Sequence, residues 1–95
     1  MLVNVVYDSS DDCDLISLSS RSFESVKTLQ SNFLNWLYDK SNDHEHWVYR
    51  NGQKMGCAYD TSVFINWVNQ FHSDYAAALI EQHVRINNDH PTICF

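Results

Sequence analysis

The chain has 95 residues, of which twelve are acidic and six are basic, so its net charge is −6 when the histidines are neutral. Such a charge repels nucleic acid and anionic lipid at long range, which argues against both as direct partners and favours a larger protein with a basic surface. The hydrophobic content of 44%, with only two glycines and one proline, excludes a disordered chain. We therefore expect residues 1–95 to form one small domain.

The cysteine content points to a reducing environment. The chain has an odd number of cysteines, which does not suit a disulfide framework; they are Cys13, Cys57 and Cys94. The first residues lack the features of a signal peptide, and no apolar run approaches the ~18 residues of a membrane span. These features predict a cytoplasmic protein without membrane contact.

Two short segments near the start of the chain have the pattern of strands. Residues 2–7 are rich in valine and alternate loosely, which predicts a strand. Residues 8–14 read as a polar turn, and the alternation in residues 15–19 predicts a short second strand.

A helix is expected next. Ser20 or Ser22 can cap its start, and Glu24 places an anion in its first turn, where the helix dipole favours negative charge. The helix is expected to end within residues 39–41. Its apolar stripe recurs at helical spacing and comprises Phe23, Val26, Leu29 or Gln30, Phe33, Trp36 and Leu37.

The dipeptide Asn51-Gly52 predicts a tight hairpin, because both positions of a two-residue turn need a positive φ that Asn and Gly adopt most easily. Its strands are expected over residues 44–50 and 54–59. In this register Arg50 pairs with Gln53, and on the same face Val48 pairs with Met55, His46 with Cys57 and His44 with Tyr59. The opposite face carries Tyr49 with Lys54, Trp47 with Gly56 and Glu45 with Ala58.

After the hairpin, Asp60 or Thr61 is expected to cap a helix with a buried stripe from Val63 to Phe71. Ser73-Asp74 resembles a fresh cap, which predicts a third helix from Tyr75 to about Arg85. The alternative is one long helix bent at Ser73.

The end of the chain predicts a last strand. Asn87-Asn88-Asp89 ends the preceding element, and Pro91 forbids a helix beyond it. Residues 92–95 then read as a short strand.

These elements predict an α+β fold, with a mixed, mostly antiparallel sheet of four or five strands and two or three helices packed mainly on one face. The core is expected to combine the apolar stripes of the helices with the valines of the first strand and one face of the hairpin. The expected core residues are Val3, Val5, Phe33, Trp36, Leu37, Val48, Met55, Phe64, Trp67, Val68, Phe71, Leu79 and Ile80.

The hairpin offers a candidate partner-binding surface. If Val48 and Met55 face the helices, then Trp47 and Tyr49 face outward, next to Arg50. Tryptophan, tyrosine and arginine dominate interface hot spots. The alternative is that helices cover both faces and the two aromatic side chains belong to the core.

The acidic loop offers a second contact. Asp8, Asp11, Asp12 and Asp14 can imitate the phosphates of a nucleic acid or engage an arginine- and lysine-rich cleft of a partner. The alternative is a solvated loop without a partner.

His44, His46 and Cys57 are weak candidates for zinc ligands, because thiolate and imidazole suit this metal. Their spacing matches no zinc signature, so we expect no metal. The same register suggests Cys57 as a nucleophile with His46 as its base, but the acidic surroundings disfavour a thiolate. Because the chain also lacks a phosphate-binding glycine loop, we expect no cofactor and no enzymatic activity.

The sequence therefore favours a small acidic protein-interaction module that occupies a basic, nucleic-acid-binding cleft of a larger protein. Inhibitors made by viruses or mobile elements against host or defence proteins have this character. Two alternatives stay open. One is a metal- or thiol-dependent enzyme that uses His46 and Cys57, and the other is a homo-oligomeric structural protein, for instance a homodimer, that pairs through a free sheet edge.

Overall fold

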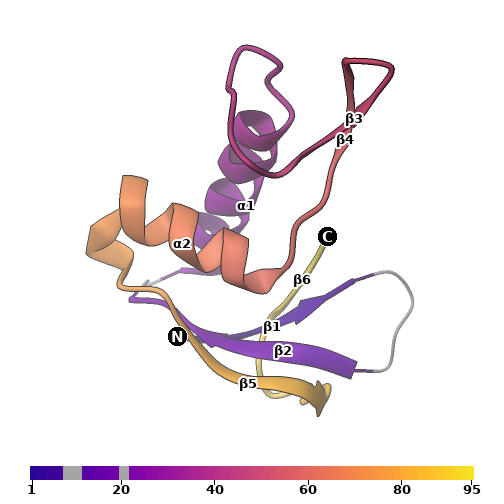
Figure 1. Ribbon diagram of the computed structural model, residues 1–95. Helices are drawn as coiled ribbons and strands as arrows, with labels where there is room; N and C mark the ends of the chain where they lie inside the picture. Colours follow the sequence, from indigo (N-terminus) through magenta and orange to yellow (C-terminus); the bar gives the residue numbers. More distant parts are fainter. Residues whose placement is uncertain (8–11, 20–21) are drawn as a thin grey trace.

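The computed structural model describes residues 1–7, 12–19 and 22–95 (Figure 1). It has an α+β fold, as the sequence predicts, in which two helices lie on one face of a four-stranded sheet and a separate hairpin stands beside them. In chain order the elements are β1 (Leu2–Val6), β2 (Asp12–Ser17), α1 (Phe23–Leu37), β3 (Trp47–Arg50), β4 (Gln53–Cys57), α2 (Thr61–Phe71), the 3-10 turn η1 (Ser73–Tyr75), β5 (Ala78–Arg85) and β6 (Thr92–Cys94).

The main sheet has the strand order β5-β2-β1-β6. Strand β1 pairs antiparallel with β2 and parallel with β6, and β2 pairs antiparallel with β5, so the sheet is mixed and mostly antiparallel. Val3 and Val5 lie opposite Ile16 and Ile93, and all four side chains are buried. The β-branched residues at the centre thus form the sheet layer that the helices cover.

Both predicted helix caps are confirmed. The Ser22 side chain accepts a hydrogen bond from the Ser25 amide at 3.3 Å, and the Asp60 carboxylate accepts one from the Val63 amide at 3.1 Å. Helix α1 ends at Leu37, slightly earlier than expected. Among the described residues, no helix is both long enough and apolar enough to cross a membrane.

Phe33 is the centre of the core. Its ring is fully buried and lies 5.3 Å from the ring of Phe64 and 5.5 Å from that of Trp67. Most of the predicted core is confirmed, with Trp36 and Leu79 packed against it in partly buried positions. Four predicted members are instead about half exposed, namely Val48 (49%), Met55 (61%), Phe71 (50%) and Ile80 (49%).

The prediction of a third helix is wrong, and so is the alternative of one long bent helix. Helix α2 ends at Phe71, a single 3-10 turn follows, and Ala76 adopts a left-handed φ of 45° that breaks the helical path. The chain then runs as β5 along the edge of β2. The helix propensity of Ala76 to Ala78 is outweighed by the backbone hydrogen bonds that β2 offers.

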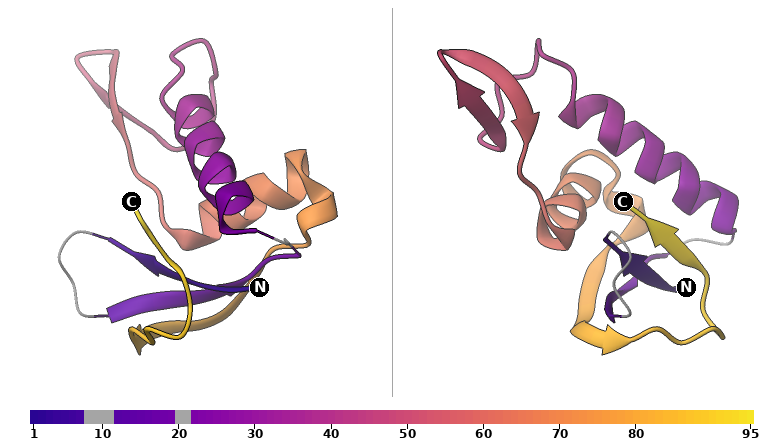
Figure 2. Two further views of the ribbon diagram at one scale, coloured as in Figure 1. Left: turned by 180° about the vertical axis from the view of Figure 1, so that it is seen from behind. Right: turned by 90° about the vertical axis from the view of Figure 1, so that its right-hand side faces the viewer.

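The hairpin forms its own two-stranded sheet and does not join the main one. Asn51 and Gly52 have φ values of 53° and 76°, which confirms the predicted turn. The hairpin stands away from the main sheet, beside the end of α1 (Figure 2). Its position leaves the turn at the periphery of the molecule.

Candidate functional site

The register of the hairpin differs from the predicted one beyond its first two pairs. Arg50 lies opposite Gln53 and Tyr49 opposite Lys54, as expected. The register then shifts, so that Met55 has no partner and forms a β-bulge. The pairs that follow are Val48 with Gly56 and Trp47 with Cys57, so the predicted pairs Val48–Met55, Trp47–Gly56 and His46–Cys57 are wrong.

Burial along the hairpin differs from the prediction at three of its residues. Trp47 is only 7% exposed, so the prediction that it faces outward is wrong. Tyr49 is 56% exposed, and Arg50 is exposed as well, so these two lie on the surface as expected. Val48 and Met55, predicted to face the helices, are on the surface too. We call the exposed side chains of Val48, Tyr49, Arg50 and Met55 the hairpin tip.

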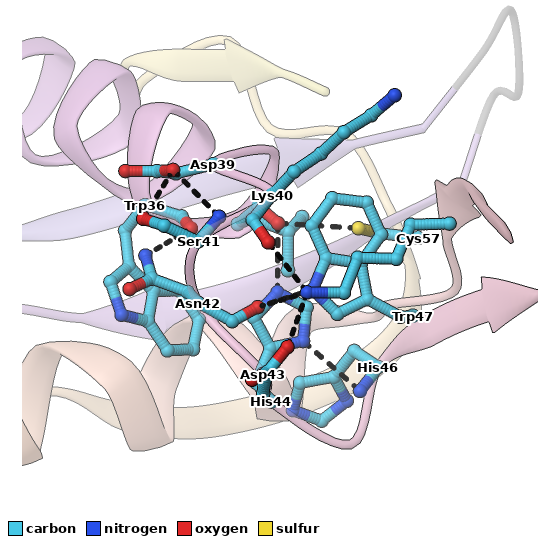
Figure 3. Close-up of polar contacts among 12 residues, drawn as sticks. Trp36, Asp39, Lys40, Ser41, Asn42, Asp43, His44, His46, Trp47 and Cys57 are labelled. Carbon is cyan, nitrogen blue, oxygen red and sulfur yellow. Dashed lines mark hydrogen bonds and ion pairs between the residues drawn. The ribbon is translucent and has the colours of Figure 1, made fainter.

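Trp47 is buried against the loop that links α1 to the hairpin (Figure 3). Its indole Nε1–H donates a hydrogen bond to the Asn42 carbonyl at 2.6 Å. The His44 ring stacks on the indole with centroids 5.1 Å apart and planes 4° apart. The Lys54 ammonium lies 5.2 Å from the indole centroid, within cation–π range. We call Asn42, His44, Trp47 and Lys54 the hairpin anchor.

Lys54 ties the hairpin to the same loop. Its ammonium donates to the carbonyls of Lys40 at 2.6 Å and Asn42 at 3.3 Å, and it forms a short ion pair with Asp43 (Figure 3). The hydrogen bond and the charge of Lys54 lower the pKa of the Asp43 carboxyl. With three oxygen partners for its three N–H groups, the ammonium is fully satisfied and fixes the hairpin on the loop.

Both ring nitrogens of His44 have partners. Nδ1 accepts a hydrogen bond from the His46 amide at 3.1 Å, so Nε2 carries the proton and donates to the Leu37 carbonyl at 2.7 Å. The Cys57 thiol donates to the same carbonyl at 3.3 Å. Among the described residues, no three His, Cys, Asp or Glu side chains converge as metal ligands would. The hydrogen bonds of these residues join the end of α1 to the loop and to β4; the residues are His44, His46 and Cys57.

Cys57 also differs from the predicted nucleophile. It lies opposite Trp47, and the expected pairing with His46 does not occur. Burial raises the pKa of the Cys57 thiol, which disfavours the thiolate at neutral pH. Strand pairing therefore does not place the predicted base, His46, opposite the sulfur.

The predicted acidic loop is in part a strand. Asp8 and Asp11 lie outside the described residues, while Asp12 and Asp14 belong to β2. Asp12 is exposed and sits opposite Arg85. Asp14 accepts hydrogen bonds from the Thr61 hydroxyl and from the His83 amide, the latter at 3.3 Å. The prediction of a polar turn over residues 8–14 is thus wrong for Asp12 to Asp14, which lie in β2, although Asp12 is exposed to solvent as expected.

A hydrogen-bond chain joins Asp14 to Tyr7. Because the Thr61 hydroxyl gives its only proton to Asp14, it accepts from the Tyr7 hydroxyl, 3.0 Å away. Burial raises the pKa of Tyr7 to about 12, and the negative charges of Asp14 and Asp60 add to this effect. Tyr7 therefore stays protonated in the folded protein well into the alkaline range.

The raised pKa of Tyr7 predicts a loss of stability at alkaline pH. The phenol has an ordinary pKa of 10.0 and a folded pKa of about 12, so the folded state holds the proton more tightly. The resulting stability is complete below pH 10.0 and is lost as the pH rises to about 12. Urea denaturation of wild type and Tyr7→Phe across this range should show a steeper decline for wild type. Because the other tyrosines are present in both proteins, parallel declines would contradict the prediction.

The comparisons with known proteins return no match: no protein-family model fits the chain, and no curated sequence or solved structure is significantly similar to it. The geometry of the described residues alone defines two candidate sites, namely the hairpin tip with its anchor and the acidic end of the main sheet. The sequence predicted Tyr49 and Arg50 for the first site and Asp12 and Asp14 for the second. The prediction missed the loop that covers Trp47, and it missed the bulge at Met55, although a glycine inside a strand, here Gly56, is a known sign of a bulge.

Proposed function

We propose that this chain is a non-enzymatic protein-interaction module that docks on a larger protein through the hairpin tip. Val48, Tyr49 and Met55 are each about half exposed on a hairpin that stands away from the main sheet. Exposed apolar and aromatic side chains on one protruding hairpin are typical of segments that a partner protein grips. This protruding tip is the observation that carries the proposal.

The hairpin anchor supports this role because it orders the hairpin before a partner arrives. Trp47 is held by a hydrogen bond, a stacked ring and a cation, and Lys54 by three oxygen atoms. Ordering a loop during association costs binding free energy, so a hairpin that is already fixed binds more tightly. The anchor thus presents Tyr49 and its neighbours in a defined geometry.

Charge indicates the kind of partner. The chain carries a net charge of −6, and the side chain of Glu45 beside the hairpin is 88% exposed. A cationic protein surface attracts such a molecule and speeds the encounter. We therefore propose a partner whose docking surface is basic, as in a nucleic-acid-binding cleft. Occupying that cleft would make the chain an inhibitor.

The test compares wild type with a tip variant that combines Val48→Ser, Tyr49→Ser and Met55→Ser. Phe71→Ser is the matched control, because Phe71 is also half exposed but lies on α2. Proteins captured from a lysate are identified by mass spectrometry, and the affinity of the purified partner is then measured at rising salt concentrations. We expect the tip variant to bind roughly tenfold more weakly and added salt to weaken wild-type binding.

Three outcomes would contradict the proposal. One is equal affinity of the tip variant and wild type, with unchanged circular dichroism. Another is affinity that does not respond to salt. The third is the absence of any partner that distinguishes wild type from the tip variant.

A further inference from the structure

A small pocket lies at the acidic end of the main sheet, away from the hairpin. It has a volume of about 160 Å³ and is lined by Val5, Tyr7, Asp12, Cys13, Asp14 and His83. Pockets for drug-sized ligands and cofactors measure roughly 300–1,000 Å³, so this one is too small for a nucleotide or a large cofactor. Its volume suits a small polar group such as the end of one side chain.

Asp14 gives the pocket its chemical character. Its two carboxylate oxygens accept hydrogen bonds from the Thr61 hydroxyl and the His83 amide, both of which are neutral donors. No lysine or arginine in the described part of the chain forms an ion pair with Asp14. A carboxylate has about four acceptor positions, and side chains and amides of the described residues fill two of them. The pocket therefore favours a cation that donates hydrogen bonds.

The geometry favours an organic cation over a metal ion. No three His, Cys, Asp or Glu side chains of the described residues are placed to hold a metal, although Asp12, Asp14, His83 and Cys13 all line the pocket. A guanidinium group is planar, carries a delocalised charge, pairs with a carboxylate through two parallel hydrogen bonds and packs against aromatic rings such as that of Tyr7.

We propose that this pocket receives one arginine side chain of the basic partner protein. The inference rests on the proposed function and adds to it a second, specific contact at the opposite end of the molecule from the hairpin tip. Asp14 supplies the charge, and its hydrogen bonds from Thr61 and His83 fix the orientation of the carboxylate. Tyr7, protonated and half buried, supplies the ring surface.

The test uses the wild-type protein and two small probes, N-acetyl-arginine amide and N-acetyl-citrulline amide. The probes have nearly the same size, but only the arginine probe is charged. Titration followed by two-dimensional NMR of the backbone amides should show shifts with the arginine probe that are confined to Asp12, Cys13, Asp14 and His83. We expect citrulline to bind about tenfold more weakly, because a charged hydrogen bond is lost. Shifts that are absent, scattered over the surface, or equal for both probes would overturn the proposal.

A pair of variants adds a second measurement. Asp14→Asn removes the charge in the pocket, whereas Asp74→Asn removes an equal charge on η1 outside it. We expect the first to lose the response to arginine and the second to keep it, and an unchanged response in a folded Asp14→Asn protein would overturn the proposal. Partner binding that fails in the tip variant but persists in Asp14→Asn would reject the pocket and keep the proposed function. If the protein binds the arginine probe but captures no partner protein, the pocket proposal stands and the proposed function is rejected.

Discussion

Replacing Phe33 with alanine is expected to lower the free energy of unfolding by about 3–5 kcal/mol. The ring is fully buried, and it lies within ring-contact distance of five other aromatic side chains, those of Trp36, Tyr59, Phe64, Trp67 and Phe95. Removing it opens a cavity between α1 and α2 and takes away these contacts together. Because small domains have a total stability of about 5–15 kcal/mol, the variant should be close to unfolding.

Urea denaturation followed by tryptophan fluorescence measures this loss. Phe71→Ala is the matched control, since it deletes the same ring from a site on α2 that is 50% exposed. We expect Phe71→Ala to lower the free energy of unfolding by roughly 1 kcal/mol or less. Equal losses in the two variants would show that Phe33 is not the centre of the core.

Trp47→Ala is expected to have the second-largest effect, a loss of about 3 kcal/mol or more in the hairpin region. The indole fills the space between the hairpin and the preceding loop, and its Nε1–H satisfies the Asn42 carbonyl. Without it, the ring of His44 loses its stacking partner and Lys54 loses its cation–π contact. The hairpin should then open locally while the main sheet stays folded.

Hydrogen exchange measured residue by residue separates local from global opening. In Trp47→Ala the amides of β3 and β4 should exchange much faster, while those of β1 and β2 keep their protection. Tyr49→Ala is the control, because Tyr49 belongs to the same strand but is 56% exposed and should cost little stability. Unchanged exchange in β3 and β4 would mean that the hairpin does not depend on Trp47.

The sequence predicted correctly the turn and the helix caps, because each of them depends only on residues that are neighbours in the chain. The Asn51-Gly52 turn and the caps at Ser22 and Asp60 each depend on a few neighbouring atoms, and all three are confirmed. The helical stripe that contains Phe33 was also predicted, because helical periodicity over four turns leaves only one apolar face.

The errors concern features that depend on tertiary contacts. Residues 78–85 include helix-forming residues, yet the edge of β2 lies close enough to pair with them as β5. Trp47 is buried because the loop with Asn42 and His44 covers its ring. Asp14 belongs to an acidic run in the sequence, but Thr61 of a remote helix binds its side chain. For β5 and Asp14 the deciding contact spans a long sequence separation, whereas Trp47 depends on how a neighbouring loop folds.

The parallel pairing of β1 with β6 has a consequence for folding during synthesis. The two strands come from opposite ends of the 95-residue sequence, and Asn4 in β1 binds the carbonyl of Asn87 at 2.8 Å. A nascent chain therefore cannot complete its sheet until residues 92–94 have left the ribosomal tunnel. Until then one edge of β1 stays open and the Asn4 amide lacks its partners, so the sheet is expected to form cooperatively through its non-local contacts.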